Sequence, residues 1–337
     1  MGAMTPDRRP PLPGVFGRFV AAVYRREIGR RNRAFDRGAG VVRLDRPVIS
    51  VGNLSVGGTG KTPMVMRVVD VLLDAGRRPC IAMRGYKAVD GVSDEAEEYR
   101  SRLEGVPVVA QGDRVAGLRE LLTRDGDIDV VVLDDGFQHR RIARDLDIVL
   151  VDATRDPFED RLLPSGWLRE PVASLGRAQV VVITHAECVD GQRIQAMAGR
   201  VRDVTPGAAI AVARHAWAGF VDERGREAAA LGRALVVCAI GHPAPFLMQA
   251  REHVEVVKEI VLRDHDPYEP ATIERIRREG VGLDLILTTG KDWAKLSRAG
   301  GWACPVVRPV LEMSFDRGWE ELRGRVLGAA EQAASIA

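Results

Sequence analysis

Residues 55–62 have the types and the spacing that suit the binding of a phosphate chain. Three glycines allow backbone N–H groups to converge on phosphate oxygens, the lysine that follows can reach the outer phosphates, and the threonine hydroxyl can bind Mg²⁺. The match to the pattern G-x-x-x-x-G-K-[ST] is imperfect, because Ser55 stands at the first glycine position. The alternative is an ordinary glycine-rich turn between a strand and a helix. We predict that a nucleotide is held by Ser55, Val56, Gly57, Gly58, Thr59, Gly60, Lys61 and Thr62.

Two acids that follow an apolar run supply the second chemical signal. Residues 130–133 are all apolar and lead directly into Asp134 and Asp135. A buried strand of this kind delivers carboxylates to its carboxyl end, which is where doubly wound sheets bind ligands. Either acid could instead cap the following loop. Together with Lys61 and Thr62, the pair predicts a site for the Mg²⁺ of a bound nucleotide.

Other charged segments have a structural and a catalytic interpretation. Asp94, with Glu97 three residues on, suits a helix N-cap, and a carboxylate there could also act as a catalytic base. His265 lies between two aspartates, which suits proton handling but also fits a surface turn with a capping aspartate. Loop 162–171, which carries Arg169 and Glu170, is bounded by prolines and is typical of a functional loop.

Apolar strand-like runs alternate with helical patterns, which predicts an α/β fold with a doubly wound parallel sheet of the P-loop NTPase type. Strands are expected at 48–51, 79–83, 106–110, 130–133, 147–152 and 179–184, and a helix from residue 65 with Pro63 in its first turn. The pattern changes near 208–226, which indicates a second, smaller α/β domain. We therefore expect a helix at 1–33, a core domain at 34–213, a linker at 214–232, a smaller domain at 233–304, and a return strand with a final helix at 305–337.

Composition narrows the class of protein. Hydrophobic residues make up 46% and charged residues 28% of the 337, which is ordinary globular usage and excludes a disordered chain. The four cysteines are widely spaced, which favours reduced thiols over disulfides or a zinc site. No apolar run is long enough to span a bilayer and no signal peptide is evident. We expect no nucleic acid and no obligate protein partner.

The N-terminal arm is basic and amphipathic. Residues 1–43 contain ten arginines and three acids, a net charge of +7. Residues 13–33 place an apolar stripe along one face of a helix, with arginines opposite. Such a helix can lie in the interface of an anionic membrane. The alternative is that the stripe packs on the protein's own core, and the sequence favours neither.

Taken together, these segments resemble the tetraacyldisaccharide 4′-kinase family, the lipid A 4′-kinases of Gram-negative bacteria. The matching segments are VGNLSVGGTGKTP (51–63), RGY (84–86), SDEA (93–96), DDGFQHRR (134–141), LLPSGWLREP (162–171), DHDPY (264–268) and TTGKDWAKL (288–296). The segments at 51–63 and 134–141 are highly specific, and Ser55 agrees with this family's version of the loop.

The resemblance implies transfer of the ATP γ-phosphate to the 4′-hydroxyl of a membrane-embedded tetraacyldisaccharide 1-phosphate, giving lipid IVA. It also implies two α/β domains joined by a two-stranded linker, and a peripheral protein on the cytoplasmic face of the inner membrane. The cofactors that it implies are ATP and Mg²⁺. Position by position, it implies Lys61 and Asp135 as catalytic residues, and Asp94 as the base with His265 as its partner. It further implies metal contacts from Thr62, Asp134, Asp135 and Glu170, and substrate contacts from Arg84, Arg114 and Arg169.

Some positions depart from the family pattern or bear on an alternative. Lys87 stands where glycine is more common, and Gly290 where an acid is common. The alternative function is a membrane-associated regulatory P-loop ATPase of the partitioning kind. Those loops carry a lysine directly before the double glycine, where this chain has Val56, and this counts against that function.

Overall fold

The computed structural model describes residues 10–85, 94–241, 243–264 and 266–331, except for the side chains of residues 94 and 95. The chain forms two compact units, one of Met1–Arg214 with Met313–Ala337 and the other of His215–Glu312. The division falls inside two long strands, β7 (Ala209–Val221) and β12 (Val306–Arg317), and not in a loop.

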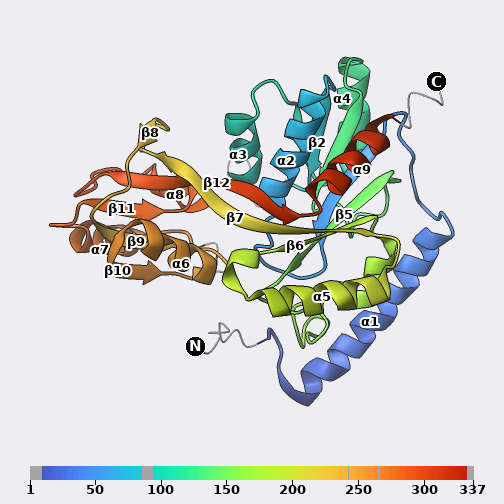
Figure 1. Ribbon diagram of the computed structural model, residues 1–337, viewed down its shortest axis with the longest axis horizontal. Coiled ribbons are helices and arrows are strands. Elements are labelled where there is room, and N and C mark those ends of the chain that lie inside the picture. Colours follow the sequence, from blue (N-terminus) through green and yellow to red (C-terminus); the bar gives the residue numbers. More distant parts are fainter. Residues whose placement is uncertain (1–9, 86–93, 242, 265, 332–337) are drawn as a thin grey trace. The chain divides into compact units, whose positions relative to one another are not determined.

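A parallel sheet with the strand order β7-β6-β5-β1-β4-β2-β3 forms the centre of the larger unit (Figure 1). The chain enters the sheet at its middle, so β1 pairs with β4 on one side and with β5 on the other. Its strands are β1 (Val48–Asn53), β2 (Pro79–Met83), β3 (Val108–Ala110), β4 (Val130–Asp134), β5 (Leu146–Asp152), β6 (Val180–Thr184) and the first part of β7.

Helices cover both faces of this sheet, which explains why β1, β4 and β5 are buried along their whole lengths. On one face α2 (Lys61–Asp74), α3 (Asp94–Arg102) and α9 (Trp319–Glu331) pack on alternate strand residues. On the other face lie α4 (Arg114–Arg124) and α5 (Gly191–Val204). The predicted doubly wound parallel α/β fold is confirmed.

The smaller unit has its own parallel sheet, in the order β10-β9-β11-β12. Its other strands are β8 (Glu227–Ala228), β9 (Arg233–Cys238), β10 (Glu255–Val261) and β11 (Leu285–Thr288), and β8 pairs antiparallel with the end of β7. Its helices are α6 (Pro243–His253), α7 (Pro270–Glu279) and α8 (Gly290–Leu296).

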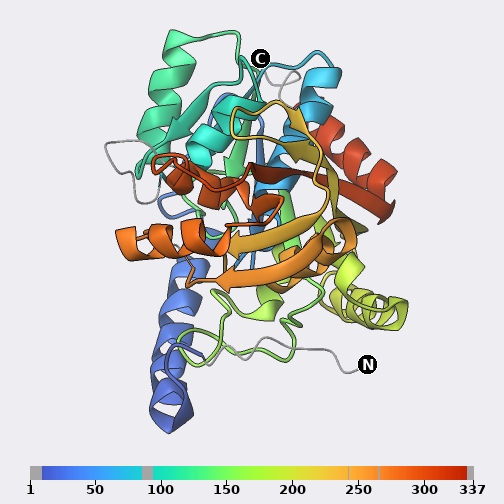
Figure 2. The same cartoon turned by 90° about the vertical axis from the view of Figure 1, so that its left-hand side faces the viewer.

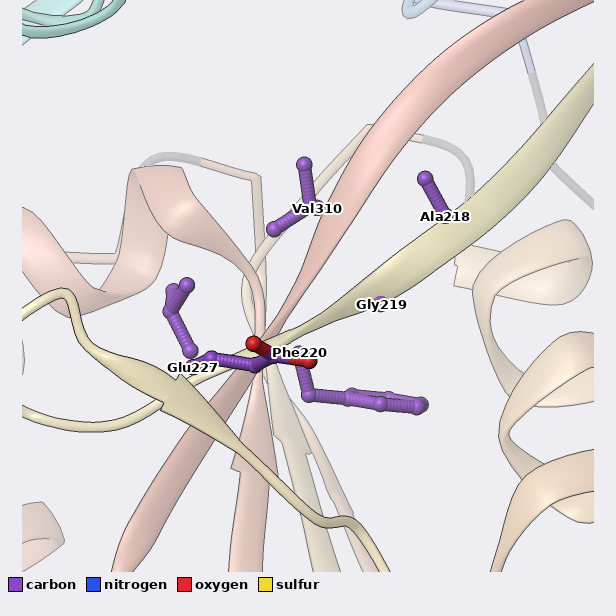
Figure 3. Close-up of a pocket in the computed structure, with 6 residues that line it drawn as sticks. Ala218, Gly219, Phe220, Glu227 and Val310 are labelled. Atoms are coloured by element: carbon purple, nitrogen blue, oxygen red, sulfur yellow. The ribbon is translucent and has the colours of Figure 1, made fainter.

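A surface hollow in the smaller unit lies beside strands β7, β8 and β12 (Figure 3). The residues that line it are mostly apolar, with Glu227 as the one ionisable residue among them, and they include none of the predicted site residues. The hollow therefore does not mark the site of the predicted chemistry.

Helix α1 (Gly14–Asp36) is a single long helix of the larger unit (Figure 2). It buries Ala21 and Ile28, and the Tyr24 hydroxyl donates to the carbonyl of Arg169 at 2.9 Å. Its first turns leave apolar side chains in solvent: Val15, Phe16, Phe19 and Val23 are 57–74% exposed. Along the described chain, no helix combines the length and the apolar character that crossing a bilayer requires.

Candidate active site

The glycine-rich loop connects the buried end of β1 to the first turn of α2. Gly57 and Gly60 have φ of 133° and 84°, values that side-chain-bearing residues rarely adopt. Gly60 is the N-cap of α2, so Lys61 and Thr62 form the first turn of the helix. The N–H groups of such a turn, with the positive end of the helix dipole, attract anions.

Contacts from both sides hold this loop in shape. The Asn53 side-chain amide donates to the carbonyl of Ser55 at 2.7 Å and to the Thr59 hydroxyl at 2.9 Å. The functional loop expected from its prolines runs alongside, because the Val56 N–H donates to the carbonyl of Trp167 at 2.9 Å. Asn53 is therefore part of the loop's framework, although sequence reasoning assigned it no role.

Asp135 lies at the centre of a cluster of charges. One nitrogen of Arg169 contacts both of its carboxylate oxygens, at 2.7 and 2.8 Å, and the Lys61 ammonium lies 3.6 Å away. Burial alone would raise the pKa of Asp135, but Lys61 and Arg169 outweigh it and lower that pKa below its usual range. The structure thus brings together Lys61, Asp135 and Arg169, which sequence reasoning placed in three separate segments.

Asp135 also has a backbone geometry that is uncommon for residues other than glycine. Its φ is 51°, in the left-handed region, directly after β4 ends at Asp134. Residues held in this region cluster at functional sites, because the surrounding structure must compensate for the strain. The turn directs the carboxylate of Asp135 toward Lys61, while the side chain of Asp134 contacts α3.

Tyr99 makes that link to α3. It is fully buried, and its hydroxyl donates to Asp134 at 3.1 Å and interacts with the Thr62 side chain. Burial raises the pKa of Tyr99 well above its usual value, so the phenol keeps its proton. Tyr99 therefore brings Thr62 and Asp134 together, and it was missed because a tyrosine inside a helical pattern looks like any core residue.

Two arginines near the end of β4 bear on the binding of an anion. Arg114 is almost fully buried, donates to the carbonyl of Asp135 at 3.4 Å, and faces Arg84 closely enough for the two charges to repel. Burial, partly offset by Asp135 and Asp134, lowers the pKa of Arg114. Like charges held in this way favour an anion beside them.

The remaining predicted residues are placed as follows. Glu170 is completely buried, and it accepts from Asn32 of α1 at 2.8 Å and from Arg177 at 3.0 Å. Its described contacts thus lie on the α1 side, and not with Asp134 and Asp135. The backbone of Asp94 begins α3, but its side chain lies outside the described part of the chain, as does His265.

The oxygen groups assembled here fit Mg²⁺. The Thr62 hydroxyl and the carboxylates of Asp134 and Asp135 are hard donors of the kind that Mg²⁺ takes alongside nucleotide phosphates. Nearby, His139 cannot add positive charge at neutral pH, because burial together with Arg114, Arg141 and Arg144 lowers its pKa to about 4. The cations that act on Asp135 are Lys61, Arg169 and Arg114.

Comparison with known proteins shows the family to which the chain belongs. Residues 15–322 match the family model described as tetraacyldisaccharide-1-P 4′-kinase. The tetraacyldisaccharide 4′-kinase of Geobacter sulfurreducens is 38% identical, covering 87% of each chain, and that of Chlorobaculum parvum is 34% identical, covering 93% of this chain and 94% of the other. A crystal structure of LpxK from Aquifex aeolicus in complex with ATP aligns with a TM-score of 0.71 and 28% identity, over 92% of this chain and 97% of the other. The chain belongs to the tetraacyldisaccharide-1-P 4′-kinase family.

Proposed function

We propose that this protein transfers the γ-phosphate of ATP to the 4′-hydroxyl of a tetraacyldisaccharide 1-phosphate, yielding lipid IVA. The observation that carries the proposal is the convergence of Lys61 and Arg169 on Asp135, beside a glycine-rich loop that opens α2. Phosphoryl transfer depends mainly on positioning and on neutralising charge, and these residues are suited to both. The alternative, a regulatory ATPase, gives the arginine pair at the end of β4 no task.

Each residue has a defined part in this reaction. The loop N–H groups and Lys61 hold the phosphate chain, and Thr62, Asp134 and Asp135 would hold Mg²⁺. When bound, Mg²⁺ neutralises part of the charge on the phosphate oxygens. Arg169, released in part from Asp135 as anionic phosphates arrive, offers its guanidinium to them together with Arg84 and Arg114. Glu170 supports the metal site indirectly, through the loop that carries Arg169.

A phosphotransfer assay tests the proposed function. The protein, Mg·ATP and the monophosphorylated lipid disaccharide are incubated in detergent, and the lipid products are measured by mass spectrometry. We expect a product heavier by one phosphate, formed in step with ADP. ADP release without a phosphorylated lipid would contradict the kinase and support the regulatory ATPase.

We further propose that Asp94 is the general base, with His265 as its partner. The support is that α3 begins at Asp94, while Tyr99 on the same helix donates to Asp134, so the start of α3 lies near the end of β4. A carboxylate there can accept the proton of the attacking hydroxyl.

Asp94→Asn is expected to lower kcat on the order of 10²- to 10⁴-fold, the usual contribution of general base catalysis. The Kd for Mg·ATP should change little, because the proton is accepted only during transfer. Glu97→Gln serves as the control, since Glu97 lies one turn along α3 and pairs with Arg100. An Asp94→Asn variant with the kcat of Glu97→Gln would leave Asp94 as a helix cap only.

The exposed face at the start of α1 supports a proposed position at the cytoplasmic surface of the inner membrane. Val15, Phe16, Phe19 and Val23 are in solvent there, while Ala21 and Ile28 are buried and Tyr24 donates to Arg169. Apolar side chains of this kind insert into the headgroup region, and nearby arginines attract anionic lipids. A substrate with acyl chains would then be reached without leaving the bilayer.

Replacing both Phe16 and Phe19 with serine should weaken binding to phosphatidylglycerol vesicles about a hundredfold or more, because each ring loses about 1.5–3 kcal/mol of apolar burial. Co-sedimentation with the vesicles measures this. Leu231→Ser is the matched control, since Leu231 is as exposed but lies in the smaller unit. Equal binding by the double variant and the control would refute the anchor.

A further inference from the structure

Two side chains at the end of β6 hold the glycine-rich loop from behind. The Thr184 hydroxyl donates to the carbonyl of Thr59 at 3.1 Å, and Nε2 of His185 lies 3.2 Å from the carbonyl of Gly58. Thr184 is fully buried and His185 is 7% exposed. Both contacts join residues more than 120 positions apart in the sequence.

These contacts decide where the loop's N–H groups point. In a planar trans peptide the C=O of one residue and the N–H of the next point in opposite directions. Holding the carbonyls of Gly58 and Thr59 from behind therefore turns the N–H groups of Thr59 and Gly60 to the opposite side. Within the described residues, these two N–H groups donate to no protein acceptor, whereas the Val56 N–H is taken by Trp167.

Glu187 favours the form of His185 in which both ring nitrogens carry a proton. Its carboxylate lies 3.3 Å from Nδ1 of His185, so Nδ1 carries a proton toward Glu187 while Nε2 donates to Gly58. Burial alone would lower the pKa of His185, but Glu187, Asp152 and the Gly58 carbonyl raise it. His185 also has a φ of 57°, a strained backbone that persists only where the surroundings hold it.

We propose that Thr184 and His185 are positioning residues that present the N–H groups of Thr59 and Gly60 to the phosphate chain of a nucleoside triphosphate. The inference rests on the proposed function, because it assumes that the loop binds ATP. It adds the end of β6 to the nucleotide site as a rigid support. The free loop is then already in its binding shape, so little ordering is needed when the nucleotide arrives.

The test compares paired variants by calorimetric titration with Mg·ATP, without lipid. Thr184→Val and His185→Leu each remove one donor and should raise the Kd about tenfold, since a hydrogen-bond network to a charged ligand is weakened. His185→Gln replaces the Nε2 donor with an amide N–H and should restore most of the affinity. At saturating ATP, kcat with the lipid should stay close to that of the unaltered protein.

Thr205→Val is the control, because its buried hydroxyl also donates to a backbone carbonyl, that of Ala178, but away from the loop. This variant shows how much the loss of one such bond lowers the general stability of the protein. The stability of every variant is measured by thermal melts without nucleotide. A rise in Kd for Thr184→Val no greater than for Thr205→Val overturns the inference, as does equal affinity of His185→Leu and His185→Gln. If the unaltered protein binds no Mg·ATP, the proposed function fails instead.

Discussion

Lys61→Met is expected to lower kcat on the order of 10²- to 10³-fold, the usual cost of removing one preorganised charge from a developing anion. The ammonium lies 3.6 Å from Asp135 and 3.4 Å from the Asn53 side-chain carbonyl, so it is already held at the mouth of the loop. Methionine retains most of the side chain's length and removes the charge. The loss should therefore appear in phosphoryl transfer, measured by lipid product formed per unit time at saturating ATP.

The control for Lys61→Met is Lys258→Met, which removes a lysine that pairs with Glu279 on the smaller unit. Its kcat should match that of the unaltered protein. Thermal melts should also show that Lys61→Met folds, because Lys61 sits in the first turn of α2 and contributes little to the core. A kcat for Lys61→Met within a few-fold of the control would contradict the assignment of this loop to the γ-phosphate.

The centre of the fold could be predicted from sequence because its signals are local. β2 spans the predicted residues 79–83, and β4 and β6 lie within a residue of the predicted runs, since these strands are covered on both faces and must be apolar throughout. α7 received no prediction, although Pro270 at its start and Ile273 and Ile276 on one face were available signals.

The contacts within the site could not be predicted, because they join positions far apart in the chain. Asp135 and Arg169 are 34 residues apart, and Tyr99 and Asp134 are 35 apart. Some of these residue types suggested a chemical role from sequence alone. The proximity of the ends of β1 and β4, however, depends on the order of the strands in the sheet. The burial of Glu170 against Asn32 likewise depends on where α1 packs.

Helix α1 shows why two interpretations of one pattern could not be separated by sequence. An apolar stripe looks the same whether it packs on protein or faces lipid. In the structure the stripe is divided along its length, since Ile28 is buried while Phe16 and Phe19 remain in solvent. Packing of one end places the other end in solvent, and this follows from the length of the helix and not from its composition.

Asp135→Asn is expected to lower kcat by about 10²-fold or more, because the carboxylate both orients Lys61 and Arg169 and is the proposed ligand of Mg²⁺. The asparagine keeps the shape and removes the charge. The pKa of Asp135 is held low by Lys61 and Arg169, so the carboxylate is ionised throughout the neutral range and its contribution is lost only as pH falls through that lowered pKa. Activity of the unaltered protein near neutral pH should therefore show no step from Asp135.

A double-mutant cycle with Arg169→Met separates the two roles of Asp135. If the ion pair with Arg169, at 2.7 Å, were its whole contribution, the double variant would lose no more activity than either single variant. We expect a further loss instead, together with a higher Mg²⁺ concentration for half-maximal activity in Asp135→Asn but not in Arg169→Met. Titration with Mn²⁺, followed by its paramagnetic resonance in the presence of ATP, should show the same difference in metal affinity without turnover. Equal Mn²⁺ affinity in the two single variants would restrict Asp135 to orienting its cationic neighbours.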